Sequence, residues 1–221
     1  MKIKGIEKSK DFYIITIDQD QYQIDLDTMH KYQLKVGVDL SAKTVQSIID
    51  DTLKNQLQQR ALKRLKKMMT EHEMRIFLEE QGGTKAIIDG IIAKFKTYKY
   101  IDDFTYAQTF LKIKAHQKGP LYIIQTLKEK GVQQNIINQT FQDYDQESFL
   151  IPLMEKKVLK DQQVSINELK QTLFRHFSAK GFENDCILRC IDHVISNASI
   201  NEEDALEKAF YKTFLKLQRK D

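Results

Sequence analysis

The chain has 221 residues and a mass of 26.0 kDa, which is enough for a self-sufficient core in one large or two small domains. With 41% apolar and 30% charged residues it is neither disordered nor fibrous, and no apolar run approaches the roughly 18 residues that a membrane span needs. The 35 basic and 31 acidic residues give a net charge of +4, too small to imply nucleic-acid binding by itself.

The first forty residues predict a small antiparallel β-sheet. Apolar and polar side chains alternate over residues 13–17 and again over 22–26, with turn residues at 18–20 between them, which is typical of a β-hairpin. Further strands are expected over 3–7 and 32–36. A sheet this small must pack on something else, so we expect it to lie against the helices that follow. Residues 1–40 are therefore assigned as an N-terminal β extension.

From Ser41 the apolar period changes to 3.6 residues, which predicts a long helix reaching about Leu65. Thr70 with Glu73 has the spacing of a capping box, in which each side chain satisfies a free amide of the first turn. Ser165 and Glu168 repeat this spacing. Pro120 suits a first helical position, where its missing N–H has no consequence. The remainder of the chain is accordingly expected to be helical.

Three segments of the chain align with one another. Gly82, Gly131 and Gly181 each follow an apolar helical run, at intervals of 49 and 50 residues, and each suits the left-handed position that ends a helix. The apolar columns downstream of the glycines also match. We expect tandem three-helix repeats that form an elongated, curved array. The predicted divisions are residues 41–98, 99–145 and 146–198, followed by a C-terminal helix over 199–221.

Positive charge is concentrated in the middle of the chain. Residues 52–142 contain 16 lysines and arginines against 8 acids, and there is no acid between Asp51 and Glu71. Two basic clusters are candidate surfaces for an anionic partner. A solvated helix face is the alternative interpretation of each cluster.

The sequence contains no phosphate-binding glycine loop, zinc-protease helix or nucleophile elbow. Cys186, Cys190 and His193 have helical spacing that could suit a metal. However, the repeat register places both cysteines in columns that hold core residues elsewhere, so we expect small buried side chains. The protein is therefore not expected to be an enzyme, to bind a metal or to carry a cofactor. The absence of an apolar signal segment and the presence of only two cysteines favour a cytoplasmic location.

Several dispersed motifs in residues 61–132 occur in a fixed order and spacing. They are Ala61-x3-Leu65, Thr70-Glu71-x-Glu73-x-Arg75-x2-Leu78, Tyr100-Ile101-Asp102-Asp103-x3-Ala107-x2-Phe110 and Lys118-Gly119-Pro120-x3-Ile124-x2-Leu127-x2-Lys130-Gly131-Val132. In this order and spacing they resemble the RecX family of bacterial recombinase regulators. The resemblance covers about residues 60–195.

The resemblance implies a regulator of recombination, DNA repair and the SOS response that binds the RecA recombinase, usually as its nucleoprotein filament on single-stranded DNA. Such a protein would inhibit the ATPase and strand exchange of RecA, and could contact single- or double-stranded DNA directly. The residues expected at the partner or DNA are Lys63, Arg64, Lys66, Lys67, Arg75, Lys112, Lys114 and Lys118.

A general nucleic-acid-binding helical module that competes for DNA is the alternative function. The basic stretches contain few aromatic residues that look exposed, so we expect no stacking platform of the kind that single-strand binders use.

Overall fold

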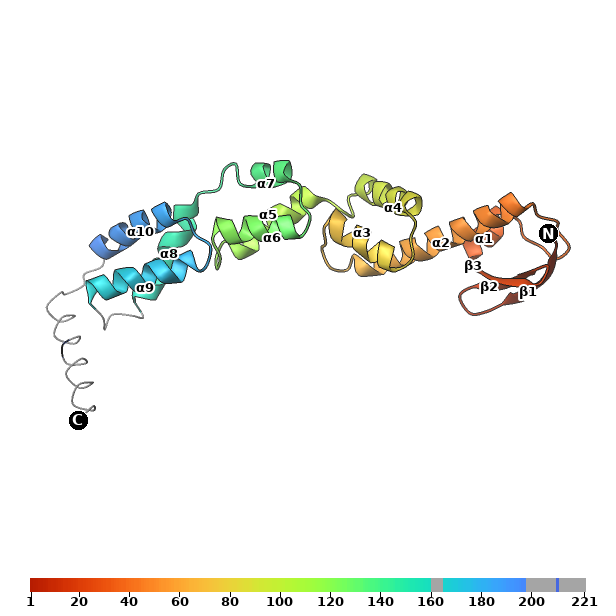
Figure 1. The fold of residues 1–221 in the computed structure, drawn as a ribbon, viewed down its shortest axis with the longest axis horizontal. Coiled ribbons are helices and arrows are strands. Elements are labelled where there is room, and N and C mark those ends of the chain that lie inside the picture. Colours follow the sequence, from red (N-terminus) through yellow and green to blue (C-terminus); the bar gives the residue numbers. More distant parts are fainter. Residues whose placement is uncertain (160–164, 198–209, 211–221) are drawn as a thin grey trace, which may run out of the picture. The chain divides into compact units, whose positions relative to one another are not determined.

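The computed structural model describes residues 1–159, 165–197 and 210, which form three strands and ten helices (Figure 1). The predicted mainly helical fold with a small N-terminal antiparallel sheet is confirmed. None of the described helices is both long enough and apolar enough to cross a bilayer. The predicted C-terminal helix over 199–221 lies outside the described residues, apart from Phe210.

The elements of the described chain are, in order, β1 (Ile3–Lys8), β2 (Tyr13–Ile17), β3 (Asp20–Ile24), α1 (Leu26–Lys31), α2 (Ala42–Arg64), α3 (Glu71–Glu80), α4 (Lys85–Thr97), α5 (Asp103–Lys114), α6 (Pro120–Glu129), α7 (Gln134–Thr140), α8 (Gln146–Val158), α9 (Ile166–Ser178) and α10 (Asn184–Asn197). They fall into two compact units, Met1–Asp102 and Asp103–Asp221. The predicted boundaries of the individual repeats stay a prediction.

The sheet has the order β1-β2-β3 and is antiparallel throughout, as the alternating pattern predicted. Ile15 of β2 lies opposite Ile6 on one side and Tyr22 on the other. The buried face of the sheet packs on Val45 and Ile48 of α2. The expectation that the sheet needs a helix to cover its apolar face is therefore confirmed.

The strand expected over residues 32–36 is wrong, and so is the extension of the hairpin to Leu26. The Asp25 side chain accepts a hydrogen bond from the Thr28 backbone N–H at 3.0 Å and thereby caps α1. Leu26 begins that helix, and Val36 is exposed in the turn that follows it. The Asp25 cap favours a helix over a strand here because it satisfies a free backbone amide of the first turn. Alternation of apolar and polar residues provides no such hydrogen bond.

Helix α2 serves both cores of the first unit. Ser41 caps its start by accepting from the Thr44 backbone N–H at 3.1 Å. The first half of α2 packs on the sheet, whereas Leu57 and Ala61 in its second half are fully buried against α3 and α4. One 23-residue helix thus joins the β extension to the first helical set.

Three helix ends repeat the same backbone bonds, as the glycine register predicted. Gly82, Gly131 and Gly181 have φ values of 86°, 75° and 82°. In each case the residue after the glycine donates its N–H to the carbonyl five residues earlier, at 2.9 to 3.2 Å. This is the bond of a Schellman motif, whose left-handed residue is usually glycine because it has no Cβ.

The helix starts were also predicted correctly. Thr70 Oγ1 accepts from the Glu73 backbone N–H at 3.2 Å, while Glu73 Oε2 accepts from the Thr70 N–H at 3.0 Å, which completes the capping box. Pro120 occupies the first turn of α6, and Ser165 caps α9. These local signals determine where the helices begin. They therefore also determine where the turns that contain the basic residues lie.

Candidate partner-binding surfaces

The first basic cluster lies where α2 ends and the chain turns toward α3. Lys63 and Arg64 occupy the last turn of α2, where the helix dipole favours cations. Lys66 and Lys67 follow in the turn. All four side chains are exposed, so the structure brings together four of the residues predicted from the sequence.

A hollow of about 360 Å³ adjoins this cluster. The Arg64 guanidinium lies 5.5 Å from the centroid of the Phe77 ring at its wall. Met68, which is 56% exposed, adds a flexible apolar side chain. The full lining is Arg64, Lys67, Met68, Met69, Glu73, Ile76, Phe77 and Glu80. Mixed cations, methionines and an aromatic ring are typical of a surface that packs against a protein.

Arg75 lies apart from this cluster because it is engaged in ion pairs. Its Nε contacts Glu71 at 2.8 Å and its Nη1 contacts Asp89 at 2.6 Å, which ties α3 to α4. Lys96 approaches the same Glu71 at 2.8 Å. Burial would raise the pKa of Glu71, but the hydrogen bonds from Lys96 and Arg75 outweigh it and hold that pKa below its usual range. Arg75 therefore has a visible structural role in the first unit.

The second predicted group lies in the other unit, around the end of α5. Lys112 is exposed, whereas Lys114 lies 5.9 Å from the centroid of the Phe110 ring. Lys118, in the turn before α6, lies 4.5 Å from the centroid of the Tyr122 ring. Lys112 and Lys114 are two residues apart on a helix and so do not share a face.

Sequence reasoning missed a hollow of about 400 Å³ in the second unit. Among the described residues that line it none is acidic, unlike in the hollow beside α3. The lining consists of His116, Gln117, Leu153, Lys156, Lys157, His176, Phe177 and Lys180. Burial, followed by the charges of Lys118 and Lys157, lowers the pKa of Lys180, as expected where like charges converge.

Two turns of the second unit interlock beside this hollow. The Gly119 N–H donates to the Lys180 carbonyl at 2.9 Å, and the Leu121 N–H donates to the Gly181 carbonyl at 3.0 Å. Lys-Gly occurs at 118–119 and 180–181 but also at 4–5 and 130–131, so this dipeptide does not single out the pairing in the sequence. The structure thus brings Lys118 together with lysines that the sequence analysis had not selected.

The two cysteines pack in the core of the second unit, as their repeat columns predicted. Their Sγ atoms are 3.9 Å apart, and both residues are almost completely buried. Burial, together with the neighbouring Cys186, raises the pKa of the Cys190 thiol to about 12. The acid near them is Glu147, which accepts two hydrogen bonds from Arg189, whereas His193 contacts Asn197. The two Sγ atoms and a Glu147 carboxylate oxygen lie within 4.8 Å of one another, which is close enough to hold a metal ion.

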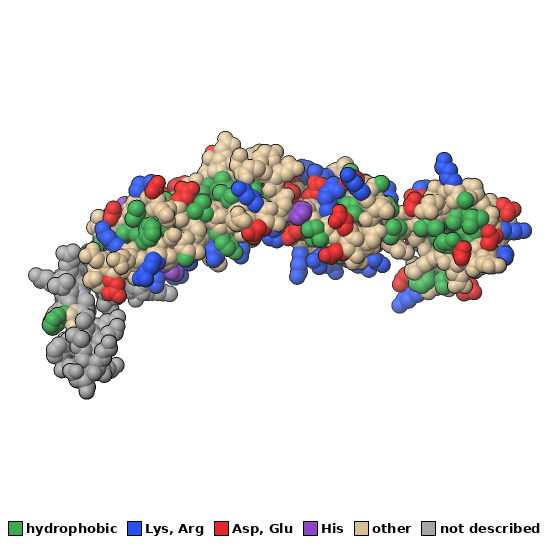
Figure 2. Space-filling view, viewed as in Figure 1, with side chains coloured by type: hydrophobic (Ala, Val, Ile, Leu, Met, Phe, Trp, Pro, Cys, Tyr) green, Lys and Arg blue, Asp and Glu red, His purple; other side chains and the backbone are tan. Residues whose placement is uncertain are grey.

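Exposed tyrosines occur near the basic stretches. Tyr98 and Tyr100, just after α4, are 60% and 55% exposed, and Tyr122 is also exposed beside Lys118. Tyr98 and Tyr100 lie outside the two basic stretches for which few exposed aromatic rings were expected, so the absence of a stacking platform stays a prediction. The sequence did not single out these tyrosines, because only packing determines whether a tyrosine is exposed. On the face drawn in Figure 2, basic and acidic side chains are interspersed. Charge alone therefore does not mark a binding surface on this face, and exposed aromatic rings are a second criterion.

Curated relatives match almost the whole chain, although no family model matches it. A regulatory protein RecX of Listeria monocytogenes is 29% identical, with 99% of this chain and 86% of the relative covered. The protein of that name from Streptococcus mutans is 28% identical, covering 100% and 88% respectively. The one from Bacillus subtilis is 29% identical, covering 91% and 80%.

Solved structures support the fold. A crystal structure of regulatory protein RecX superposes with a TM-score of 0.66 at 22% identity, covering 86% of this chain and 98% of the other. A RecX structure from Lactobacillus salivarius gives 0.59 at 24% identity, covering 64% and 96%. At these identities the likeness establishes the architecture alone.

Proposed function

The chain belongs to the RecX family of regulatory proteins, and from this premise we propose that it binds the RecA recombinase and its filament on single-stranded DNA. In this proposal the protein acts in the cytoplasm as a modulator of recombination and DNA repair and restrains the ATPase and strand exchange of RecA. The observation that carries the proposal is the match to regulatory proteins over nearly the full length of both chains.

We place the RecA contact at the end of α2 and the adjoining hollow. Four exposed cations there can meet an acidic protein surface, while Met68, Ile76 and Phe77 can accept an apolar side chain. Charge complementarity mainly determines orientation and the rate of association, and buried aromatic contacts supply most of the binding energy. Arg75, which is paired with Glu71 and Asp89, stays a predicted partner residue outside the cluster at the end of α2.

Charge reversal tests this surface. In a variant with Lys63, Arg64, Lys66 and Lys67 each changed to Glu, the concentration needed to half-inhibit DNA-dependent ATP hydrolysis by RecA should rise at least about tenfold. The reason is that like charges would then face the partner.

The matched control reverses four exposed lysines of the N-terminal sheet and its turn, which are Lys2, Lys4, Lys8 and Lys10. Its net charge is the same as that of the test variant, so unchanged inhibition would show that position matters. Equal inhibition by the test variant and the unaltered protein would remove the α2 cluster from the proposal.

A general nucleic-acid-binding module that competes with RecA for DNA is the second candidate. It is favoured by the hollow at which three lysines lie together, namely Lys156, Lys157 and Lys180. The salt dependence of DNA binding without RecA distinguishes the two, because neutralising about six phosphates should weaken affinity roughly a thousandfold between low and moderate salt. Salt-insensitive or undetectable DNA binding with retained inhibition would favour the direct RecA contact.

A further inference from the structure

Two neighbouring tyrosines stand exposed at the end of α4. The ring centroids of Tyr98 and Tyr100 are 5.9 Å apart, with an angle of 35° between the ring planes. Tyr100 is steadied by an edge-to-face contact with the buried Phe95, at 5.8 Å between centroids. An adjacent pair of large aromatic side chains left in water is uncommon on a monomer surface and marks an interaction site. The two rings are therefore accessible to a partner.

The residue between the tyrosines adopts a strained backbone. Lys99 has a φ of 55°, in the left-handed region that L side chains rarely adopt. Its N–H donates to the Lys96 carbonyl, and the Tyr100 N–H donates to the Phe95 carbonyl at 2.8 Å. These are the same bonds that end α3, α6 and α9, where glycine holds the left-handed position. Lys99 therefore occupies a left-handed position that glycine would adopt without strain, as Gln33 does at the end of α1.

Charges of both signs surround this turn, because Lys94, Lys96 and Lys99 lie near the tyrosines while Asp102 and Asp103 follow Tyr100 closely. Lys96 is paired with Glu71, and Lys94 donates to Gln58 at 3.3 Å. Lys99 makes no ion pair with any other residue in the described part of the chain. The Lys99 backbone thus lies between two exposed rings, and its ammonium has no carboxylate partner among the residues that the structure describes.

We propose that Tyr98, Lys99 and Tyr100 form a platform for single-stranded nucleic acid, on which bases stack against the rings while Lys99 meets a backbone phosphate. Aromatic rings stack on any base, and the faces of unpaired bases are free whereas those in a duplex are already stacked. Lys99, which has no ion-pair partner among the described residues, favours an anionic partner over an apolar protein segment. This platform is distinct from the surface proposed for RecA and does not depend on RecA being the partner.

The test measures fluorescence anisotropy of a labelled oligothymidine with the full-length protein and no RecA. Tyr98→Ala should weaken binding between about fivefold and a hundredfold, the range for losing one stacked base. Tyr98 contacts Tyr100 and lies outside the core clusters, so its replacement should leave the fold intact. Tyr98→Phe keeps the ring and should keep the affinity.

Lys99→Gly distinguishes a binding role of Lys99 from a structural one, because oligonucleotide affinity should fall while thermal stability rises. The variant should melt about 2–4 °C higher, since the strain is relieved, and yet bind the oligonucleotide more weakly. The slope of log affinity against log salt should fall by about 0.7, corresponding to one lost phosphate contact on a single strand.

Gln33→Gly is the matched control. Gln33 has a φ of 48° and ends α1 with the same pair of backbone bonds, through its own N–H to His30 and the Leu34 N–H to Met29. This variant should melt higher without any change in oligonucleotide affinity. If Gln33→Gly weakened binding as much as Lys99→Gly, the platform would be overturned.

Two further outcomes would overturn the inference. One is no binding of the oligonucleotide by the unaltered protein, or equal binding by Tyr98→Ala. The other is a Tyr98→Ala variant that binds oligonucleotide normally but no longer inhibits RecA, which would make the turn a protein contact. Failure of the unaltered protein to inhibit RecA would instead count against the proposed function and leave the platform standing.

Discussion

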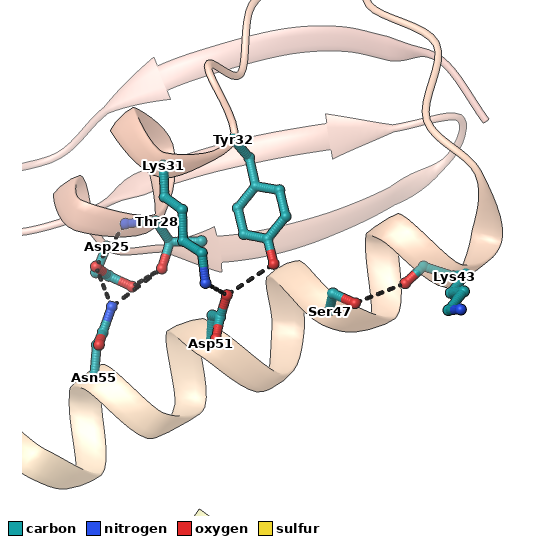
Figure 3. Close-up of polar contacts among 8 residues, drawn as sticks. All are labelled: Asp25, Thr28, Lys31, Tyr32, Lys43, Ser47, Asp51 and Asn55. Carbon is teal, nitrogen blue, oxygen red and sulfur yellow. Dashed lines mark hydrogen bonds and ion pairs between the residues drawn. The ribbon is translucent and has the colours of Figure 1, made fainter. Parts of the chain in front are cut away.

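A few polar side chains join the N-terminal sheet region to α2, and Asp51 is central among them. Its carboxylate accepts a hydrogen bond from the Lys31 ammonium at 2.6 Å and another from the Tyr32 hydroxyl at 2.7 Å (Figure 3). One turn further along α2, Asn55 donates to Asp25 and Thr28. The short helix α1 is therefore fastened to α2 at two points by hydrogen bonds as well as by apolar packing.

The Asp51 contacts should make stability depend on pH. Burial would raise the pKa of Asp51, but hydrogen bonds from Lys31 and Tyr32 outweigh it and leave that pKa lowered. Because the folded-state pKa lies below the unfolded-state value of about 4, ionised Asp51 stabilises the fold above that value. The contribution is lost as the pH falls through the folded-state pKa.

Asp51→Asn should therefore lower the free energy of unfolding by about 1 kcal/mol at pH 7, a figure reduced for the partial exposure of the site. The difference from the unaltered protein should shrink below about pH 4. Urea unfolding between pH 3 and 7 measures it. Asp50→Asn removes a carboxylate that accepts from Gln46 on the same helix, and should change stability little. A pH-independent effect of Asp51→Asn would contradict this explanation.

At the scale of elements, the repeated helix ends determine how the helices of the second unit meet. A Cβ added to Gly119 would lie 2.2 Å from the Gly181 carbonyl oxygen, so the two turns pack backbone to backbone. Local pattern predicted the left-handed glycines well, because a helix end needs only its own residues. It did not predict the role of Gly119, because the atoms that exclude a Cβ there come from residues 62 positions away.

Gly119→Ala should therefore destabilise the protein by about 2 kcal/mol or more, because the clashing atoms belong to the backbone and cannot turn aside. Gly90→Ala is the control. Its Cβ would meet only the Lys54 ammonium at 4.0 Å, and alanine favours a helix interior, so stability should rise by about 0.5–1 kcal/mol. Chemical denaturation measures the free energy of unfolding of both variants, which should fall for Gly119→Ala and rise for Gly90→Ala. An unchanged free energy of unfolding for Gly119→Ala would contradict the close packing of the two turns.

At the scale of the whole molecule, the chain forms two compact units, each with its own cores. In the first unit one cluster lies under the sheet and another around α3 and α4, while the second unit contains one cluster around α5 to α7 and another around α8 to α10. Each cluster falls entirely on one side of the division after Asp102. Each unit thus has the apolar contacts that it needs to fold.

Separate expression of residues 1–102 and 103–221 should give two folded proteins. Each should unfold cooperatively in urea, because none of the core clusters formed by the described residues is divided between them. The sum of their far-ultraviolet circular dichroism spectra should reproduce that of the full chain. A fragment that fails to fold alone would show that contacts between the units contribute to its stability.

The sequence by itself determined the helical class, the N-terminal hairpin, the helix caps and the glycine register, since each depends on residues close together in the chain. The family resemblance also followed from order and spacing. Three features were decided by the tertiary structure alone. Arg75 forms an ion pair with Asp89, and the exposed side chains of Tyr98 and Tyr100 lie next to each other. One hollow is lined by three lysines, Lys156, Lys157 and Lys180. The physical reason is that ion pairing, convergence of charge and exposure depend on which distant side chains pack together, and periodicity along a chain does not contain that information.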